Sequence, residues 1–221
     1  MGFKRHVFSH LKSWKENIDR KPLIIRGARQ VGKTTLIKQF SELFPFFISL
    51  NLEKESSKSF FDDFDDVQSI VEAIFLTNNL KIEHLGETLL FLDEIQESPK
   101  AIRLLRYFYE EMPKLYVVAA GSLLEFAMKE VSSFPVGRVQ FLYLHPMNFP
   151  EYLEAIGQNT LVDQLNLFPI RPAANKVLMD LFHRFAIIGG MPEIIKTDIE
   201  KNNLADLTAT YESIWGTYKN D

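Results

Sequence analysis

The feature that most constrains this chain is a short apolar run that breaks into a glycine-containing loop and then into a helical pattern. Leu23 to Arg26 reads LIIR, the next residues, Gly27 to Thr34, read GARQVGKT, and apolar residues then recur at helical spacing. A G-x-x-x-x-G-K-T loop between a strand and a helix is the context that a phosphate-binding loop requires. The alternative is a glycine turn that enters a helix with a surface lysine. We expect a nucleotide phosphate site at this junction.

The residue types of this loop suit phosphate groups and a magnesium ion. Its glycines let backbone N–H groups turn inward around phosphate oxygens, and the following helix presents its positive end to the same anion. Lys33 is expected to reach the β- and γ-phosphates, and the Thr34 hydroxyl to bind Mg²⁺. The predicted nucleotide-binding residues of this segment are Gly27, Ala28, Arg29, Gln30, Val31, Gly32, Lys33, Thr34 and Thr35.

A second motif places two carboxylates after an apolar run. Leu89 to Leu92 lead into Asp93 and Glu94, which is a Walker B pattern. A buried strand would carry Asp93 to the carboxyl edge of a sheet, where it binds Mg²⁺ through water, and Glu94 would polarise water against the γ-phosphate. Alone, the pattern also suits a strand that leads into a solvated turn. With the loop, it predicts a hydrolytic centre, and the glutamate argues against small-molecule P-loop kinases, which generally lack it.

Two further polar residues follow predicted strands or turns. Ser122 stands just past an apolar run, where ATPases with these two motifs carry a polar residue that senses the γ-phosphate. It also suits the N-cap of a helix. Arg138 follows a Pro-Val-Gly turn at the start of a strand. It is predicted to act as an arginine finger, in cis or from a neighbouring subunit, with a structural salt bridge as the alternative.

The apolar runs alternate with helical patterns along much of the chain. Alternating strands and helices predict an α/β fold, with a parallel sheet covered by helices on both faces. The pattern turns helical beyond Pro146, which predicts a small helical lid. The expected strands are Leu23–Arg26, Phe46–Leu52, Thr88–Asp93, Leu115–Ala120 and Arg138–Leu144, and the expected late helices are Phe149–Ile156, Pro172–Ile188 and Asp206–Tyr218.

Composition limits the compartment and the partners. The net charge of −4 gives no general attraction to nucleic acid, and the basic residues near the amino terminus, Arg5 among them, are expected to form a solvated face. The absence of Cys excludes disulfides and thiolate metal sites. No run reaches the roughly 18 apolar residues of a membrane span. We expect a soluble, cytoplasmic protein without membrane contact or a structural metal, in which the acidic residues from Asp62 to Asp66 form a solvated loop.

Together these motifs resemble the AAA-type ATPases of bacteria and archaea in which a P-loop domain precedes an uncharacterised carboxyl-terminal domain. The resemblance covers nearly the whole chain. It implies an AAA+ sheet of strand order 5-1-4-3-2, an ATPase core in residues 1–150 that begins with a helical segment (1–20), and a lid in residues 151–221. The matching motifs are GARQVGKTT (27–35), LFLDEIQE (90–97), AAGSLLE (119–125), FPVGRV (134–139), LHPMNFPEYL (144–153) and IGGMPEI (188–194).

The resemblance also implies ATP as the nucleotide and a contact between the lid and the base. Gly190 and Pro192 lie in a segment similar to the glycine–proline motif that closes over adenine in related signalling ATPases, although a helix-terminating turn explains it equally well. The chain departs from the family pattern in two ways. Arg138 stands where a lysine is expected, and the usual carboxyl-terminal domain is missing, so the chain is either shortened or a natural short form.

Two functions from different classes fit these residues. The leading hypothesis is Mg²⁺-dependent ATP hydrolysis that drives lid or subunit motion. The alternative is a nucleotide-dependent interaction switch that binds ATP with little turnover. The expected partners are ATP and ADP, with a homo-oligomer and a partner or nucleic acid bound through the missing domain as further expectations. A small-molecule P-loop kinase is the third reading.

Overall fold

The computed structural model describes residues 2–122, 124, 135 and 137–219 of the 221-residue chain. These residues fall into two compact units, each described here by itself. The sheet unit comprises Phe8–Ala28 and Lys33–Leu144, and the helical unit comprises Met1–Val7, Arg29–Gly32 and His145–Asp221. The predicted division at residue 150 into a catalytic core and a lid stays a prediction.

The sheet unit is built on five parallel strands, which confirms the predicted fold class. The strand order is β2-β3-β4-β1-β5, the same as the expected 5-1-4-3-2 order. β1 to β4 are short, mainly apolar runs that end at glycine or polar residues. The strands are β1 (Leu23–Arg26), β2 (Phe46–Asn51), β3 (Thr88–Asp93), β4 (Tyr116–Ala120) and β5 (Gln140–Tyr143).

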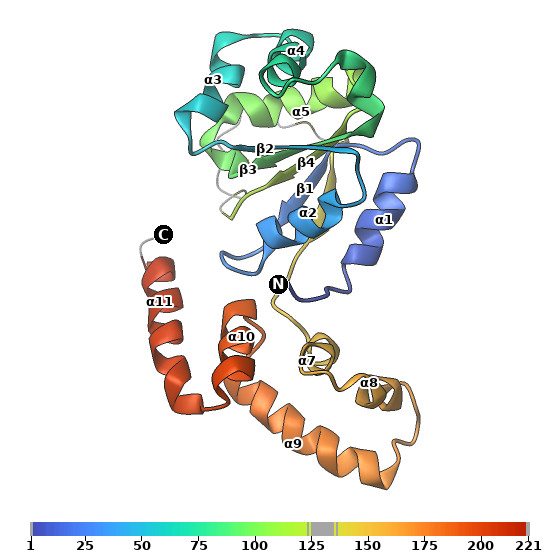
Figure 1. Ribbon diagram of the computed structural model, residues 1–221, viewed down its shortest axis with the longest axis vertical. Helices are drawn as coiled ribbons and strands as arrows, with labels where there is room; N and C mark the ends of the chain where they lie inside the picture. The colour runs from blue at the N-terminus through green and yellow to red at the C-terminus, as the bar shows by residue number, and fades with distance from the viewer. Residues whose placement is uncertain (1, 123, 125–134, 136, 220–221) are drawn as a thin grey trace. The chain divides into compact units, whose positions relative to one another are not determined.

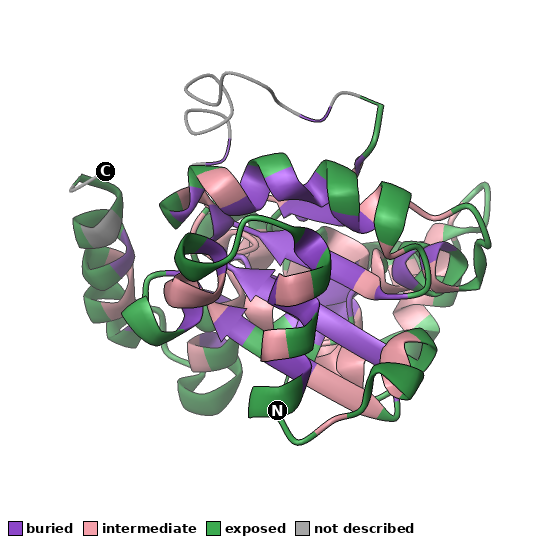
Figure 2. Cartoon of the chain, turned by 90° about the horizontal axis from the view of Figure 1, so that it is seen from above, coloured by how far each residue is buried: buried purple, intermediate pink, exposed green. Residues whose placement is uncertain are grey.

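Helices cover both faces of this sheet. Helices α3, α4 and α5 lie on one face, and α1 and α2 lie on the other (Figure 1). Figure 2 shows buried residues gathered in the strands, and exposed residues on the outward faces of the helices. The elements are α1 (Phe8–Glu16), α2 (Lys33–Ser41), α3 (Glu55–Asp63), α4 (Val67–Thr77), α5 (Pro99–Glu111) and two 3₁₀ helices, η1 (Ile82–Glu87) and η2 (Ile95–Glu97).

The two faces of the sheet are packed with different side chains. On the α4 and α5 face, aliphatic residues such as Ile74 and Leu92 form the main core with Phe108. On the other face, aromatic rings meet edge to face: the Phe44 ring centroid lies 5.2 Å from that of Phe40 and 4.9 Å from that of Tyr116. Both faces are therefore closed by apolar contacts, and the polar edge left for chemistry is the carboxyl edge of the strands.

The acidic segment after β2 is exposed to solvent, as predicted, but it is a short connection between two helices and not a longer loop. Asp62 and Asp63 end α3, and the Asp66 carboxylate caps α4 by accepting the Ser69 N–H at 2.7 Å. This bond and others from the helix start outweigh desolvation and lower the pKa of Asp66. The missed signal is the apolar spacing of α4, which buries Val67, Ile70, Val71, Ile74 and Phe75.

The helical unit confirms the helical pattern after Pro146 and adds α8 and α10, which were not predicted. Its core joins Tyr152, Ile194 and Leu207 from different helices, and Arg184 pairs with the buried Asp198 carboxylate at 2.6 Å. In the described part of the chain, no helix is both long and apolar enough to cross a membrane. The elements are α7 (Phe149–Ala155), α8 (Asn159–Leu165), α9 (Pro172–Ile188), α10 (Pro192–Lys201), a 3₁₀ helix η3 (Leu204–Asp206) and α11 (Leu207–Lys219).

Candidate functional site

The two predicted magnesium ligands lie side by side in the sheet unit. All six residues of β3 are buried, and the strand ends at Asp93, whose Oδ2 accepts a hydrogen bond from Thr34 Oγ1 at 2.9 Å. Thr34 is the second residue of α2, which follows the loop after β1. A hydroxyl and a carboxylate at the carboxyl edge of a sheet are hard oxygen donors of the kind that Mg²⁺ takes. This pair therefore fits the ion that the sequence predicts.

Lys33 is the first residue of α2, and its side chain turns back over the start of the loop. It is 7% exposed, and its ammonium donates to the carbonyl oxygens of Gly27 and Ala28, both at 2.9 Å. A lysine at the positive end of a helix experiences an unfavourable dipole, which these carbonyl oxygens offset. The ammonium is thus held at the same helix start as Thr34.

Glu94 follows Asp93 in a backbone conformation that is rare for a residue with a side chain. Its φ and ψ are 51° and 49°, in the left-handed region, and the 3₁₀ helix η2 begins after it. Left-handed backbone at a residue other than glycine costs about 1–2 kcal/mol and gathers at functional sites. The two adjacent carboxylates have different partners, since Asp93 accepts from Thr34 and Glu94 accepts from Gln96.

Gln96 is a residue of this site that the sequence reasoning missed. Its Nε2 donates to Glu94 Oε2 at 2.7 Å. Its Oε1 is buried without a hydrogen-bond partner in the structure and occupies the space that a Cβ at position 121 would need. Gly121 follows β4, so the Gln96 amide lies between the glutamate after β3 and the glycine after β4.

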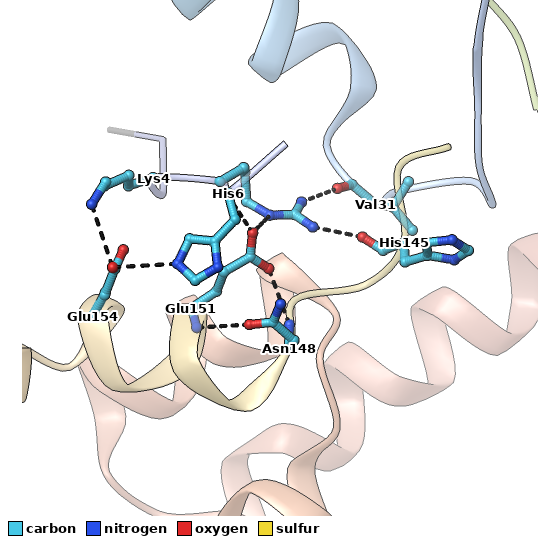
Figure 3. Close-up of polar contacts among 8 residues, drawn as sticks. Lys4, His6, Val31, His145, Asn148, Glu151 and Glu154 are labelled. Carbon is cyan, nitrogen blue, oxygen red and sulfur yellow. Dashed lines mark hydrogen bonds and ion pairs between the residues drawn. The ribbon is translucent and has the colours of Figure 1, made fainter. Parts of the chain in front are cut away.

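The tip of the phosphate loop, Arg29–Gly32, belongs to the helical unit. Gln30 and Gly32 have positive φ angles of 62° and 94°. Two side chains of the same unit hold carbonyl oxygens of this tip. Arg5 Nη1 donates to Val31 O at 3.0 Å, and the Tyr218 hydroxyl donates to Arg29 O at 3.0 Å. Figure 3 marks the contact at the labelled Val31 with a dashed line.

Arg5 corrects the expectation of a solvated basic face at the amino terminus. It is 7% exposed and pairs with the buried Glu151 carboxylate, from Nε to Oε1, at 3.2 Å. Sequence alone gave no reason to separate this arginine from its neighbours, because its partners come from distant segments.

Gly190 and Pro192 both have structural roles within the helical unit. A Cβ at Gly190 would collide with the backbone of Met147, whose N–H donates to Gly190 O at 2.7 Å. Pro192 begins α10, and its Cγ lies 3.9 Å from the position of a Cβ at Gly32. Close backbone approach accounts for Gly190 without a ligand, whereas Pro192 lies beside the loop tip. Contact of either residue with adenine stays a prediction.

Arg138 forms an ion pair within the sheet unit. Its Nε donates to Glu110 Oε1 at 2.8 Å, and Arg106 binds the same carboxylate from one helical turn away. Desolvation opposes ionisation of Glu110, but these two arginines outweigh it and lower its pKa. The salt bridge that was weighed against an arginine finger is therefore present, and the finger role stays a prediction.

Ser122 and Thr35 complete the predicted set. Ser122 is partly buried and follows Gly121 after β4. The predicted role of Ser122 as a helix N-cap concerns a segment that lies mostly outside the described residues. Parts of the AAGSLLE and FPVGRV motifs also lie outside them. Thr35 is exposed on the first turn of α2. The γ-phosphate role of Ser122 stays a prediction.

Comparisons with known proteins agree with this geometry. The family model described as AAA domain matches residues 19–153. No curated protein is significantly similar to the chain. A Walker-type ATPase of Pyrococcus abyssi has a similar structure, with a TM-score of 0.64 and 18% identity over 99% of this chain and 75% of that one. A chain in the structure of Drosophila ORC bound to DNA has a TM-score of 0.53 and 15% identity, over 87% of this chain and 59% of that one. At these identities both structures support the fold.

Proposed function

Because the chain belongs to the AAA domain family, we propose that it binds ATP, hydrolyses it with Mg²⁺ and uses hydrolysis to drive a conformational change. The observation that carries the proposal is the contact between Thr34 and Asp93, at 2.9 Å. In P-loop NTPases the loop hydroxyl and the Walker B carboxylate together hold the Mg²⁺ that binds the nucleotide phosphates. Lys33 and Glu94 flank this pair in the sequence and supply the remaining chemistry.

Each residue has a defined task in this mechanism. The Lys33 ammonium would exchange its carbonyl partners for β- and γ-phosphate oxygens, as a point charge that needs no change in the helix. Glu94 would accept a proton from the attacking water, and Gln96 would keep its carboxylate in place. Mg²⁺, when bound by Thr34 and Asp93, would neutralise charge on the phosphate oxygens.

Phosphate release measured with and without a chelator tests the proposal directly. We expect steady-state release of phosphate from ATP with Mg²⁺, and a fall to background when EDTA removes the metal, because Thr34 and Asp93 have no ion to present. The readout is a coupled phosphate assay on the full chain, with ADP affinity measured by calorimetry. Binding of ADP without any metal-dependent release would contradict hydrolysis and leave nucleotide binding intact.

The contact between Gln96 and Gly121 predicts a smaller effect on turnover. Gly121→Ala places a methyl group where Gln96 Oε1 lies, so the amide has to shift, and we expect its hydrogen bond to Glu94 to break. Loss of one hydrogen bond is worth about 0.5–1.5 kcal/mol, and we expect kcat to fall by about 2- to 10-fold, with ADP affinity unchanged. Gln96→Ala should produce the same loss. Because both changes break one interaction, the double variant should be no slower than either single variant; additive losses would show that they act separately.

A nucleotide-dependent switch is the second candidate, and one observation favours it. Arg138 is paired with Glu110 at 2.8 Å, so the best candidate for an arginine finger is engaged in its own unit. A switch would bind ATP through Lys33, change its oligomeric state and hydrolyse little. Light scattering of the full chain with and without ATP separates the two functions, since an unchanged mass together with steady turnover rejects the switch.

A further inference from the structure

We propose that Arg5 is a positioning residue for phosphate binding, which aims a backbone N–H of the loop by holding the carbonyl of the same peptide group. The proposal rests on the proposed function, because it concerns the phosphates of the nucleotide. It assigns a role to a buried side chain that neither the loop motif nor the Walker B motif contains.

The argument begins with the planarity of the peptide bond. The carbonyl of Val31 and the N–H of Gly32 belong to one trans peptide group, so they point in opposite directions. Arg5 Nη1 fixes the carbonyl oxygen at 3.0 Å. The Gly32 N–H therefore points away from Arg5. Gly32 precedes Lys33, and the backbone N–H groups at this part of such a loop bind phosphate oxygens. Because the glycine, with a φ of 94°, has no side chain to restrict it, an external hold on the peptide is valuable.

The surroundings of Arg5 hold its guanidinium rigidly. Nη2 donates to His145 O at 2.6 Å and Nε donates to Glu151 Oε1 at 3.2 Å (Figure 3). Glu151 is itself fixed, because its two oxygens accept the N–H groups of His6 at 2.7 Å and Asn148 at 3.0 Å. A planar fork that bonds three acceptors in different directions is a task for arginine that lysine cannot reproduce. The orientation of the Val31 carbonyl is therefore set by the start of α7.

Tyr218 holds a second carbonyl of the loop tip in the same way. Its hydroxyl donates to Arg29 O at 3.0 Å, and the same peptide group carries the N–H of Gln30. Gln30 has a φ of 62°, a conformation that a residue with a side chain adopts at a cost. Two peptide groups of the tip are thus oriented by side chains from opposite ends of the chain, which supports a positioning role over a single incidental contact.

The experiment compares ADP with adenosine, because only ADP uses the loop. Arg5→Gln would leave Glu151 as a buried charge without a counter-ion, which destabilises the fold for reasons unrelated to phosphate. The informative variant is therefore the double change Arg5→Gln with Glu151→Gln, which removes both charges. We expect its affinity for ADP to fall by about tenfold, with adenosine affinity unchanged. Arg5→Lys should weaken ADP affinity less than the double variant does, and Tyr218→Phe should weaken it by about threefold.

The control is Lys4→Gln, since Lys4 is an exposed neighbour that pairs with Glu154 at 3.3 Å and should leave ADP affinity as in the wild type. At saturating ATP, kcat should be retained while KM rises, whereas partial unfolding lowers kcat and leaves KM alone. Equal losses for ADP and adenosine would overturn the positioning role, as would a double variant that binds ADP as tightly as the wild type. Wild-type protein that binds no ADP would overturn the proposed function and this inference with it.

Discussion

Replacing Glu94 with Gln is expected to reduce kcat for ATP hydrolysis by a factor of about 10² to 10⁴, the usual contribution of a general base. The amide is nearly the same size and still offers an oxygen to Gln96 Nε2, which lies 2.7 Å from Glu94 Oε2 in the wild type. The left-handed backbone at this position should therefore persist. ATP affinity should be retained, so the loss would appear in single-turnover chemistry and not in binding.

Glu97→Gln is the matched control for this change. Glu97 ends the 3₁₀ helix η2 that follows Glu94, carries the same charge and is exposed. Its replacement should leave kcat unchanged, which separates the removal of the base from a general change in charge near β3. A Glu94→Gln variant that retains wild-type turnover would show that hydrolysis, if it occurs, uses another base.

Replacing Lys33 with Met is expected to weaken ADP binding by about 10- to 100-fold. A hydrogen bond from a charged group is worth about 1.5–3 kcal/mol, and each 1.4 kcal/mol changes the dissociation constant about tenfold. Met keeps most of the buried volume of the lysine stem, since the wild-type side chain is only 7% exposed. Calorimetric titration with ADP measures the change, and thermal unfolding verifies that the variant is folded.

The control for Lys33 stands on the same helix. Lys38 is an exposed lysine in the last turn of α2, and Lys38→Met removes an equal charge without touching the loop. Its ADP affinity should match that of the wild type. If both variants weaken ADP binding equally, the net charge of α2 matters and the position of the Lys33 ammonium does not.

The strands of the sheet could be predicted because their signals are local. β1 and β3 match their predicted ranges, since each is an apolar run that ends at a glycine loop or at two carboxylates. The strand order came from the family resemblance, because no local pattern says that β1 lies between β4 and β5. Thr34 and Asp93 could be paired in advance by a geometric argument. The loop after β1 and the end of β3 lie at the same edge of the sheet, because the carboxyl ends of parallel strands share one edge.

The supporting residues could not be predicted, because their roles depend on contacts between distant segments. Gln96 looks like a polar residue of a turn until its amide is seen between Glu94 and Gly121. Arg5 binds carbonyl oxygens, which carry no sequence signature, and belongs to a stretch that reads as a solvated basic face. α4 is different, since its apolar spacing was present in the sequence, although no helix was predicted there.

The pairing of β1 has a consequence for the order in which the chain becomes structured. Leu23 stands near the amino terminus, but its partners on the two neighbouring strands are Val118 and Gln140. Pairing between such distant segments slows folding, because long stretches of chain must be ordered first. During synthesis, β1 leaves the ribosome long before either neighbour exists. β1, which leads into the phosphate loop, can be paired on both sides only after β5 has been made.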